Sequence, residues 1–201
     1  LPICAVPFLM PLMLQVGFGL TPFQSGMITF VGAVGALTTK FFAKRVLIFA
    51  GFRTTLIFAC ITGAILTFVN GLFTPATPYA VMMFILLLAG FSRSFFFTSV
   101  NALAFADIPD SQASKATSMT AVLQQMSLAL GVAVAGGILE IESTLTGSKL
   151  ELADFQLAFM LISAITLSAV IPLIRMSKTA GASVSGHKMR VDPEAETIAV
   201  K

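Results

Sequence analysis

The chain has 201 residues, of which 57% are apolar and 10% are charged, and its formal net charge is +3. A soluble protein of this size carries about a quarter charged residues, whereas the mean hydropathy here is +0.96. This composition excludes an ordinary soluble domain and predicts a protein that lies almost entirely in a lipid bilayer. The small positive charge does not indicate a nucleic-acid partner, because no basic patch is interleaved with aromatic residues.

Six segments are apolar enough to form helices that cross a bilayer, which takes about 20 residues each. Clusters of helix-breaking residues separate several of them, at 17–22, 74–78 and 107–111. Strands are not expected, since barrel strands alternate in polarity and are only about 10 residues long. The expected fold class is therefore all-α, a six-transmembrane-helix bundle, with spans at about 1–16, 23–40, 54–72, 79–105, 117–139 and 155–174.

The two ends of the chain differ in character. Leu1 opens directly into apolar sequence, without a charged leader or a cleavage motif, so we interpret the chain as part of a longer protein. Residues 176–201 are polar and rich in Gly, Ser and scattered charges, and we expect them to be a disordered tail. The predicted organisation is thus one transmembrane bundle over 1–175 and a cytoplasmic tail over 176–201.

Basic residues between the spans predict the orientation in the membrane. One side has Lys149 alone, beside four acidic residues of the loop around it. The other side comprises the loop after the second span, the loop after the fourth span and the tail. We therefore expect both ends of the chain in the cytoplasm, as an even number of spans requires. The basic residues of that side are Lys40, Lys44, Arg45, Arg53, Lys115, Arg175, Lys178, Lys188, Arg190 and Lys201.

Small residues and prolines shape the predicted spans. Small residues recur at four-residue spacing, for example Gly32 and Ala36, and such faces let helices approach closely in lipid. Proline removes a backbone donor, so Pro7, Pro11 and Pro172 are expected to kink or break their helices. Kinked helices suit a bundle that bends open and shut, and helix packing alone explains them equally well.

The sequence contains no constellation typical of an enzyme, a metal site or a cofactor site. The only histidine, His187, lies in the tail, and there is no Gly-rich phosphate loop. Cys4 and Cys60 lie in apolar segments without ligand spacing, and we expect two small core residues. We therefore expect neither catalysis nor a bound metal or cofactor.

Arg93 is the only charged residue within the fourth predicted span. A guanidinium keeps its charge in proteins, and about 14 apolar or small residues precede it, too many for its side chain to reach the membrane surface. No acidic residue lies inside any predicted span. Arg93 either clamps helices together through carbonyl groups or lines a cavity that handles substrate or protons, since charges within a membrane are functional candidates by default.

Further polar and aromatic residues accompany Arg93. Phe97 and Asn101 follow at four-residue intervals and fall on the same stripe of the helix. Gln124 and Gln125 lie in the fifth span and point about 100° apart, so at most one is expected to face a cavity squarely. Each has a plain alternative role: the glutamines as bonds between helices, Asn101 as a helix cap, and Phe97 as a core or lipid-facing residue.

Three stretches carry a resemblance to a known family. They are PFLMPLMLQVGFGLTPFQSG (7–26), GFSRSFFFTSVNALAFADIP (90–109) and SKATSMTAVLQQMSLALGVAVAG (114–136). Together they resemble the C-terminal half of the fourteen-helix drug–proton antiporter branch of the major facilitator superfamily, the EmrB/QacA type. The resemblance covers about residues 1–175. One departure is Lys40, which stands near where the family's loop motif has an acidic residue.

The resemblance implies that this chain is the second of two six-helix bundles around a central cavity in the bacterial inner membrane. It implies alternating access, amphipathic small molecules as substrates, protons as the coupling ion, and the N-terminal bundle of the same protein as partner. In that architecture Arg93 and one of the two glutamines would meet substrate or a coupling network. The carboxylates that carry the proton would belong to the N-terminal bundle.

Two functions remain open on the sequence alone. The first is proton-coupled export of amphipathic or drug-like compounds, with Arg93, Gln124, Gln125, Asn101 and Phe97 as candidate binding or coupling residues. The second is a membrane module that transports nothing and anchors or assembles with a partner. Under that alternative Arg93 is a structural clamp, and the small-residue faces are the functional feature.

Overall fold

The computed structural model describes residues 5–105, 113–146 and 150–175, and all regular structure in these ranges is helical. The expected all-α fold is confirmed. The predicted tail over 176–201, together with Cys4 and Lys149, lies outside the described residues. The helices are α1 (Val6–Leu12), η2 (Met13–Gly17), α2 (Pro22–Gly71), α3 (Tyr79–Ala104), α4 (Ala113–Thr146), α5 (Leu152–Ser168) and α6 (Val170–Ile174).

Four stretches are long and apolar enough to cross a membrane: Gly51–Gly71, Tyr79–Ala104, Ala113–Thr144 and Leu152–Ile174. They match the third to sixth predicted spans. The first predicted span is shorter than expected, because its described helix covers only Val6–Gly17. At about 1.5 Å per residue that helix is too short to cross the hydrocarbon core alone.

The chain turns sharply after its first helix. Pro7 lies in the first turn of α1, where proline is tolerated, whereas Pro11 lies inside the helix and is followed by the π-helical turn η2. Thr21 then begins α2 with a reciprocal cap: its hydroxyl accepts the Gln24 N–H at 3.3 Å, and Gln24 Oε1 accepts the Thr21 N–H at 3.1 Å. The predicted breaker at 17–22 is thereby confirmed.

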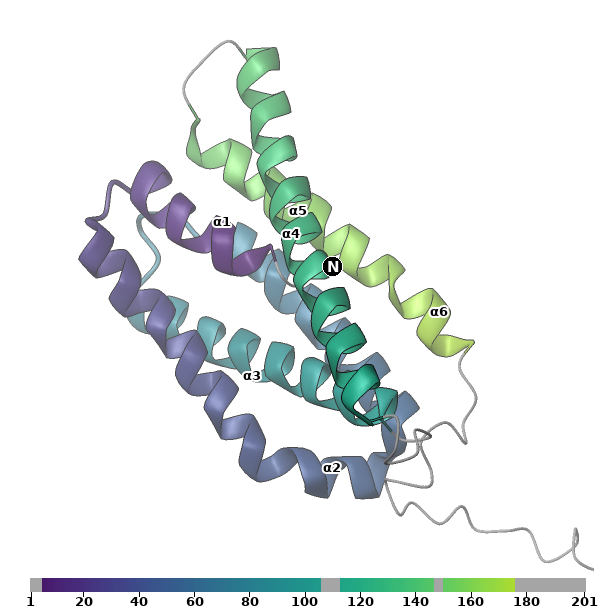
Figure 1. Cartoon of the computed structure of the whole chain (residues 1–201). Coiled ribbons are helices and arrows are strands. Elements are labelled where there is room, and N and C mark those ends of the chain that lie inside the picture. Colours follow the sequence, from purple (N-terminus) through teal and green to yellow (C-terminus); the bar gives the residue numbers. More distant parts are fainter. Residues whose placement is uncertain (1–4, 106–112, 147–149, 176–201) are drawn as a thin grey trace, which may run out of the picture.

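Helix α2 forms two arms, arm 1 over 22–50 and arm 2 over 51–71, which meet at Gly51 (Figure 1). The prediction of a loop that contains Lys40 and Arg53 is wrong, because the backbone is helical on both sides of Gly51. Gly51 has φ 70°, a conformation that side-chain-bearing residues avoid. The chain therefore changes direction at Gly51 without a loop, because the residues on both sides of it are helical.

Helix α3 packs against both arms of α2. A Cβ atom at Gly90 would overlap the carbonyl of Gly32, and one at Gly35 would overlap the carbonyl of Leu87. The hydroxyl of Ser94 donates to Ala36 O at 3.0 Å. Two more such bonds hold the backbones together, as hydroxylated residues do in lipid. Thr39 donates to Phe91 O at 3.2 Å, and Ser92 donates to Ala59 O at 3.0 Å.

Helix α5 covers the other side of arm 2. Ser163 donates to Ala64 O at 2.8 Å, and the buried Cys60 thiol donates to Thr166 O at 3.4 Å. The helix ends at Ser168 before the short α6, because Pro172 has no N–H for the Ser168 carbonyl, so the predicted break is confirmed. Arm 2 is therefore packed between α3 and α5.

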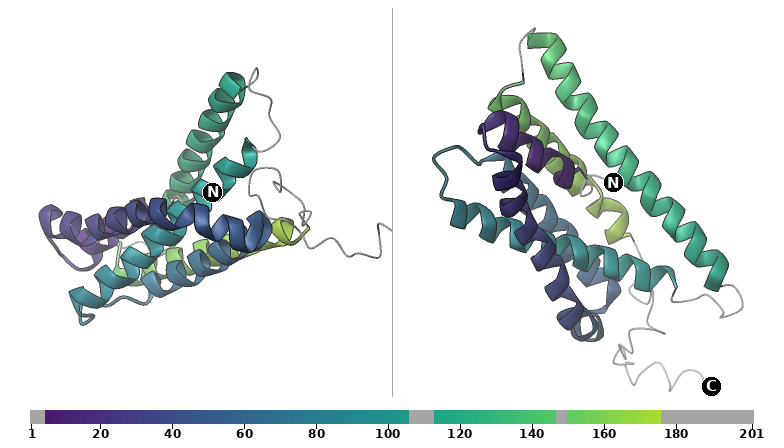
Figure 2. Two further views of the ribbon diagram at one scale, coloured as in Figure 1. Left: turned by 90° about the horizontal axis from the view of Figure 1, so that it is seen from below. Right: turned by 60° about the vertical axis from the view of Figure 1, so that its left-hand side comes forward.

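Helix α4 crosses the rest of the bundle at its edge (Figures 1 and 2). It buries Gly131, Ala135 and Leu139, spaced four residues apart, while its other faces stay exposed. The helix also runs further than expected, because Glu140 and Glu142 lie in its last turns and not in a loop. Its sparse packing leaves space between α4, α1 and α3.

We predict that Gly90→Ala destabilises the protein by about 1–3 kcal/mol, because the added methyl group must push α3 away from Gly32. The measurement is the thermal unfolding midpoint of the complete gene product in detergent. Gly137→Ala is the matched control, since a Cβ there meets nothing within 4 Å and helix propensity favours alanine. Equal melting of the two variants would show that the α2–α3 contact is not tight.

Candidate functional site

The packing of α3 determines where Arg93 lies. Ser92, Phe95 and Ser99 are buried on the face turned toward α2. Arg93 and Phe97, four residues apart, share another face and are only half-buried. The predicted stripe therefore points toward α1 and α4.

Four of the five predicted site residues line one pocket of about 400 Å³, here called the outer pocket. Its walls come from α1, α3 and α4, and the sparse packing of α4 leaves it open. It combines one guanidinium, two primary amides, a phenyl ring and aliphatic groups. The lining residues are Pro7, Arg93, Phe97, Gln124, Gln125 and Leu128.

The fifth predicted residue, Asn101, lies beside the pocket and joins two helices. Gln124 Nε2 donates to Asn101 Oδ1 at 2.6 Å, which links α4 to α3. Gln125 is exposed and makes no hydrogen bond with the described part of the chain. Both glutamines line the pocket, but only Gln125 has an amide that makes no hydrogen bond within the described part of the chain.

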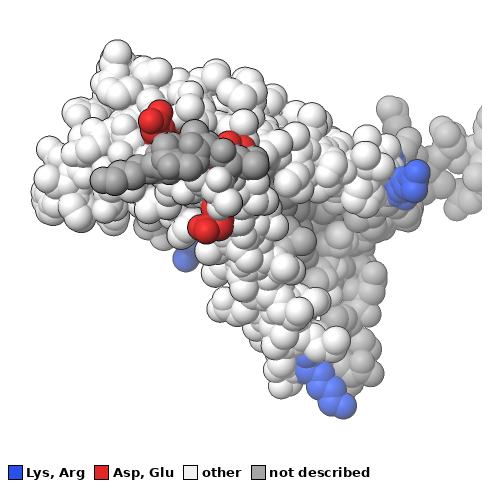
Figure 3. Space-filling view, turned by 90° about the horizontal axis from the view of Figure 1, so that it is seen from above, with Lys and Arg blue, Asp and Glu red and all other residues white. Residues whose placement is uncertain are grey.

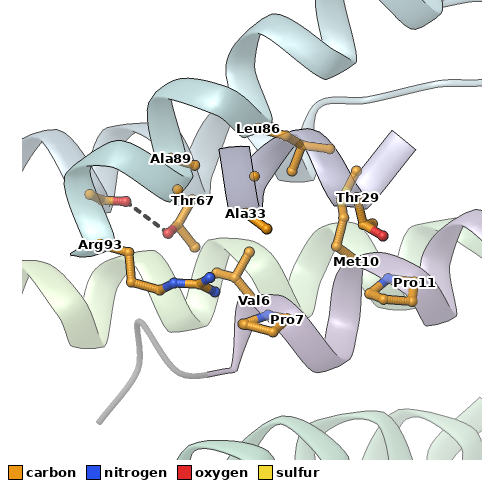
Figure 4. A pocket seen from close by; sticks show the side chains of 13 residues that line it. Val6, Pro7, Met10, Pro11, Thr29, Ala33, Thr67, Leu86, Ala89 and Arg93 are labelled. Carbon is orange, nitrogen blue, oxygen red and sulfur yellow. Dashed lines mark hydrogen bonds between the residues drawn. The ribbon is translucent and has the colours of Figure 1, made fainter. Parts of the chain in front are cut away.

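A second pocket, here called the inner pocket, has a volume of about 240 Å³ and lies between α1, α3 and both arms of α2 (Figure 4). Its polar side chains are already satisfied: Thr67 donates to Gly63 O at 2.8 Å and Thr29 to Ser25 O at 2.9 Å. The remaining wall is largely apolar. Sequence reasoning missed this pocket, because it depends on glycines and alanines of helices far apart in the chain; they are Gly32, Ala33, Gly63, Ala89 and Gly90.

Arg93 and Pro7 belong to the walls of both pockets. In Figure 4 the Arg93 side chain extends from α3 toward Val6 and Pro7 of α1. The guanidinium, which stays charged, therefore lies where the two pockets adjoin.

No acidic side chain is among the described residues that line either pocket. The acidic residues of the described ranges gather at one end of the molecule (Figure 3), at the end of α4 and the start of α5. Glu151 and Asp154 form a cap there, with the Glu151 N–H donating to Asp154 Oδ2 at 2.8 Å. No group of three potential metal ligands was found within the described ranges.

Comparison with known proteins places the chain in a family. The profile of the Major Facilitator Superfamily matches residues 4–195. Proteins named Putative multidrug resistance protein MdtD, from Escherichia coli O6:H1, Shigella sonnei and Enterobacter sp. strain 638, are each 31% identical over 134 residues, 67% of this chain. The chain spans 28% of the length of these relatives.

No solved structure matches the chain. The helical architecture, the four apolar stretches of membrane-spanning length and the family match agree with one another. The chain therefore belongs to the Major Facilitator Superfamily, a family of membrane transporters and not of enzymes.

Proposed function

We propose that this chain is the C-terminal bundle of a proton-coupled exporter of amphipathic, drug-like small molecules. The observation that carries the proposal is the outer pocket, in which a charged side chain and two amides from separate helices gather beside apolar groups. Ligand pockets typically combine an apolar wall with a few polar groups that fix orientation. The names of the relatives, multidrug resistance proteins, agree with a small-molecule cargo.

Each residue of the outer pocket has a proposed role. Arg93 binds or orients the substrate, and Gln125 offers its unbonded amide to a polar group of the same molecule. Gln124 and Asn101 hold α4 at its distance from α3 through their hydrogen bond. Phe97 supplies an aromatic surface for the apolar part of the substrate.

The sparse packing of α4 supports alternating access. Helices that change neighbours during transport cannot be locked by many contacts, and α4 exposes a large apolar surface along its length. We propose that α4, α1 and arm 1 of α2 face the N-terminal bundle, with both ends of this chain in the cytoplasm of a bacterium. The exposed apolar residues of α4 are Met119, Val122, Leu123, Met126, Leu128, Leu130, Val134 and Ile141.

We expect Arg93→Ala in the complete gene product to reduce energy-dependent efflux to the level of vector-only cells. The reason is that Arg93 is the only charged residue among the described residues that line the outer pocket. Efflux of amphipathic fluorescent dyes of negative, neutral and positive charge is measured in a host that lacks its own exporters. A protonophore added to wild type should abolish export if protons drive it.

Arg93→Lys and Lys115→Gln are the controls for this experiment. Arg93→Lys keeps the charge but loses the planar fork of donors, so partial efflux is expected. Lys115 lines neither pocket, and its substitution should leave efflux unchanged. If Arg93→Ala disappears from the membrane instead, the arginine is a structural clamp. If wild type exports none of the dyes, the exporter proposal fails and a non-transporting module is the better account.

The proposed orientation has its own test. In a background without Cys4 and Cys60, Ala76→Cys should react with a membrane-impermeant maleimide in intact cells, because the exposed α2–α3 loop faces outward. Lys115→Cys, at the opposite end of the bundle, should react only after permeabilisation. The reverse labelling pattern would contradict cytoplasmic ends.

A further inference from the structure

We infer that the two pockets form one site for an amphipathic organic anion, whose charged group lies against Arg93 and whose apolar part enters the inner pocket. The inference rests on the proposed export function, because it names the chemical class of the cargo at that same site. It goes beyond the general expectation of drug-like molecules, which leaves the sign of their charge undefined.

The charge of the walls favours an anion. Arg93 is the only charged residue among the described residues that line the two pockets. An organic cation would bring a second positive charge close to the guanidinium, where the two like charges repel each other. A carboxylate or sulfonate instead matches the guanidinium, which binds such groups through two parallel hydrogen bonds.

The other polar groups of the outer pocket point to the same class. The NH₂ group of the Gln125 side chain is a donor without a partner in the described part of the chain. Gln124 already donates to Asn101. An anion near Arg93 can therefore accept hydrogen bonds from both α3 and α4, which would hold the two helices together across the pocket.

The inner pocket suits the apolar part of the same molecule. Its threonine hydroxyls are bonded to their own helices, so it offers few unsatisfied polar groups. Its volume of about 240 Å³ and the outer pocket's 400 Å³ bring the combined space into the range of sites for drug-sized ligands, about 300–1,000 Å³. The shared residues Pro7 and Arg93 place the charged group between the two spaces.

The test compares three ligands that share one ring system. Pyrenebutyrate is the anion, pyrenebutanol the neutral match and pyrenebutyl-trimethylammonium the cation. Binding to the complete gene product is measured by fluorescence in nanodiscs of zwitterionic lipid, with empty nanodiscs as the blank. Wild type should bind the anion at least about tenfold more tightly than the neutral compound and bind the cation most weakly.

Two variants separate the charge from the apolar space. Arg93→Gln should weaken binding of the anion about tenfold and change binding of the neutral compound by less than about twofold. Ala89→Leu, which fills the inner pocket, should weaken binding of both ligands equally.

Lys115→Gln is the control, because it removes a positive charge outside both pockets and should change the binding of neither ligand. Arg93→Lys should retain a preference for the anion, and Val6→Phe fills the inner pocket from α1 if Ala89→Leu does not fold.

The outcomes distinguish this inference from the proposed function. Equal binding of the three ligands by wild type, or preference for the cation, would overturn the inference even if cells export dyes. Preference for the anion that survives Arg93→Gln would also overturn it. If the protein binds the anion selectively but cells export none of the three ligands, the anion site stands and the exporter proposal is refuted instead.

Discussion

The close approach of α3 to arm 1 of α2 is the contact on which the bundle depends. Lipid supplies no hydrophobic force to press two apolar helices together, so contact area and hydrogen bonds must do this work. Gly32, Gly35 and Gly90 remove the side chains that would keep the backbones apart. Ser94 and Thr39 then donate across the gap to carbonyls of the opposite helix. Bulkier residues at these positions would separate the helices and open the inner pocket.

The same contact explains how a permanent charge is tolerated in the middle of an apolar helix. Once α3 turns its glycine and serine face to α2, the position of Arg93 follows from helical geometry, and its side chain extends toward α1. The tightly packed core then does not enclose the guanidinium, which is only half-buried. Its residue belongs instead to the walls of both pockets. Tight packing on one face of the helix thus permits a polar site on another.

Hydropathy and spacing predicted much of this arrangement. Apolar length identified four of the six predicted spans. Pro172 indicated a helix break, and the four-residue interval indicated the stripe of Arg93 and Phe97. The missed features depend on tertiary context. The reversal at Gly51 replaces a loop with one residue, and the extension of α4 beyond Leu139 follows helix-forming residues that hydropathy alone does not score. The inner pocket could not be predicted, because its walls meet only after both arms of α2 have packed.

The loose attachment of α4 has a consequence for how such proteins diversify. Gln124, Gln125 and Leu128 form one wall of the outer pocket, yet their helix contributes only Ala135 and Leu139 to the main buried apolar cluster, most of which comes from α1, η2 and α5. Substitutions on this wall alter the chemistry offered to a ligand while costing little folding free energy. The wall opposite, on α3, has no such freedom, because its neighbours hold the bundle together. Under the proposed function, substitutions on α4 are therefore the ones expected to change ligand preference with the smallest loss of stability.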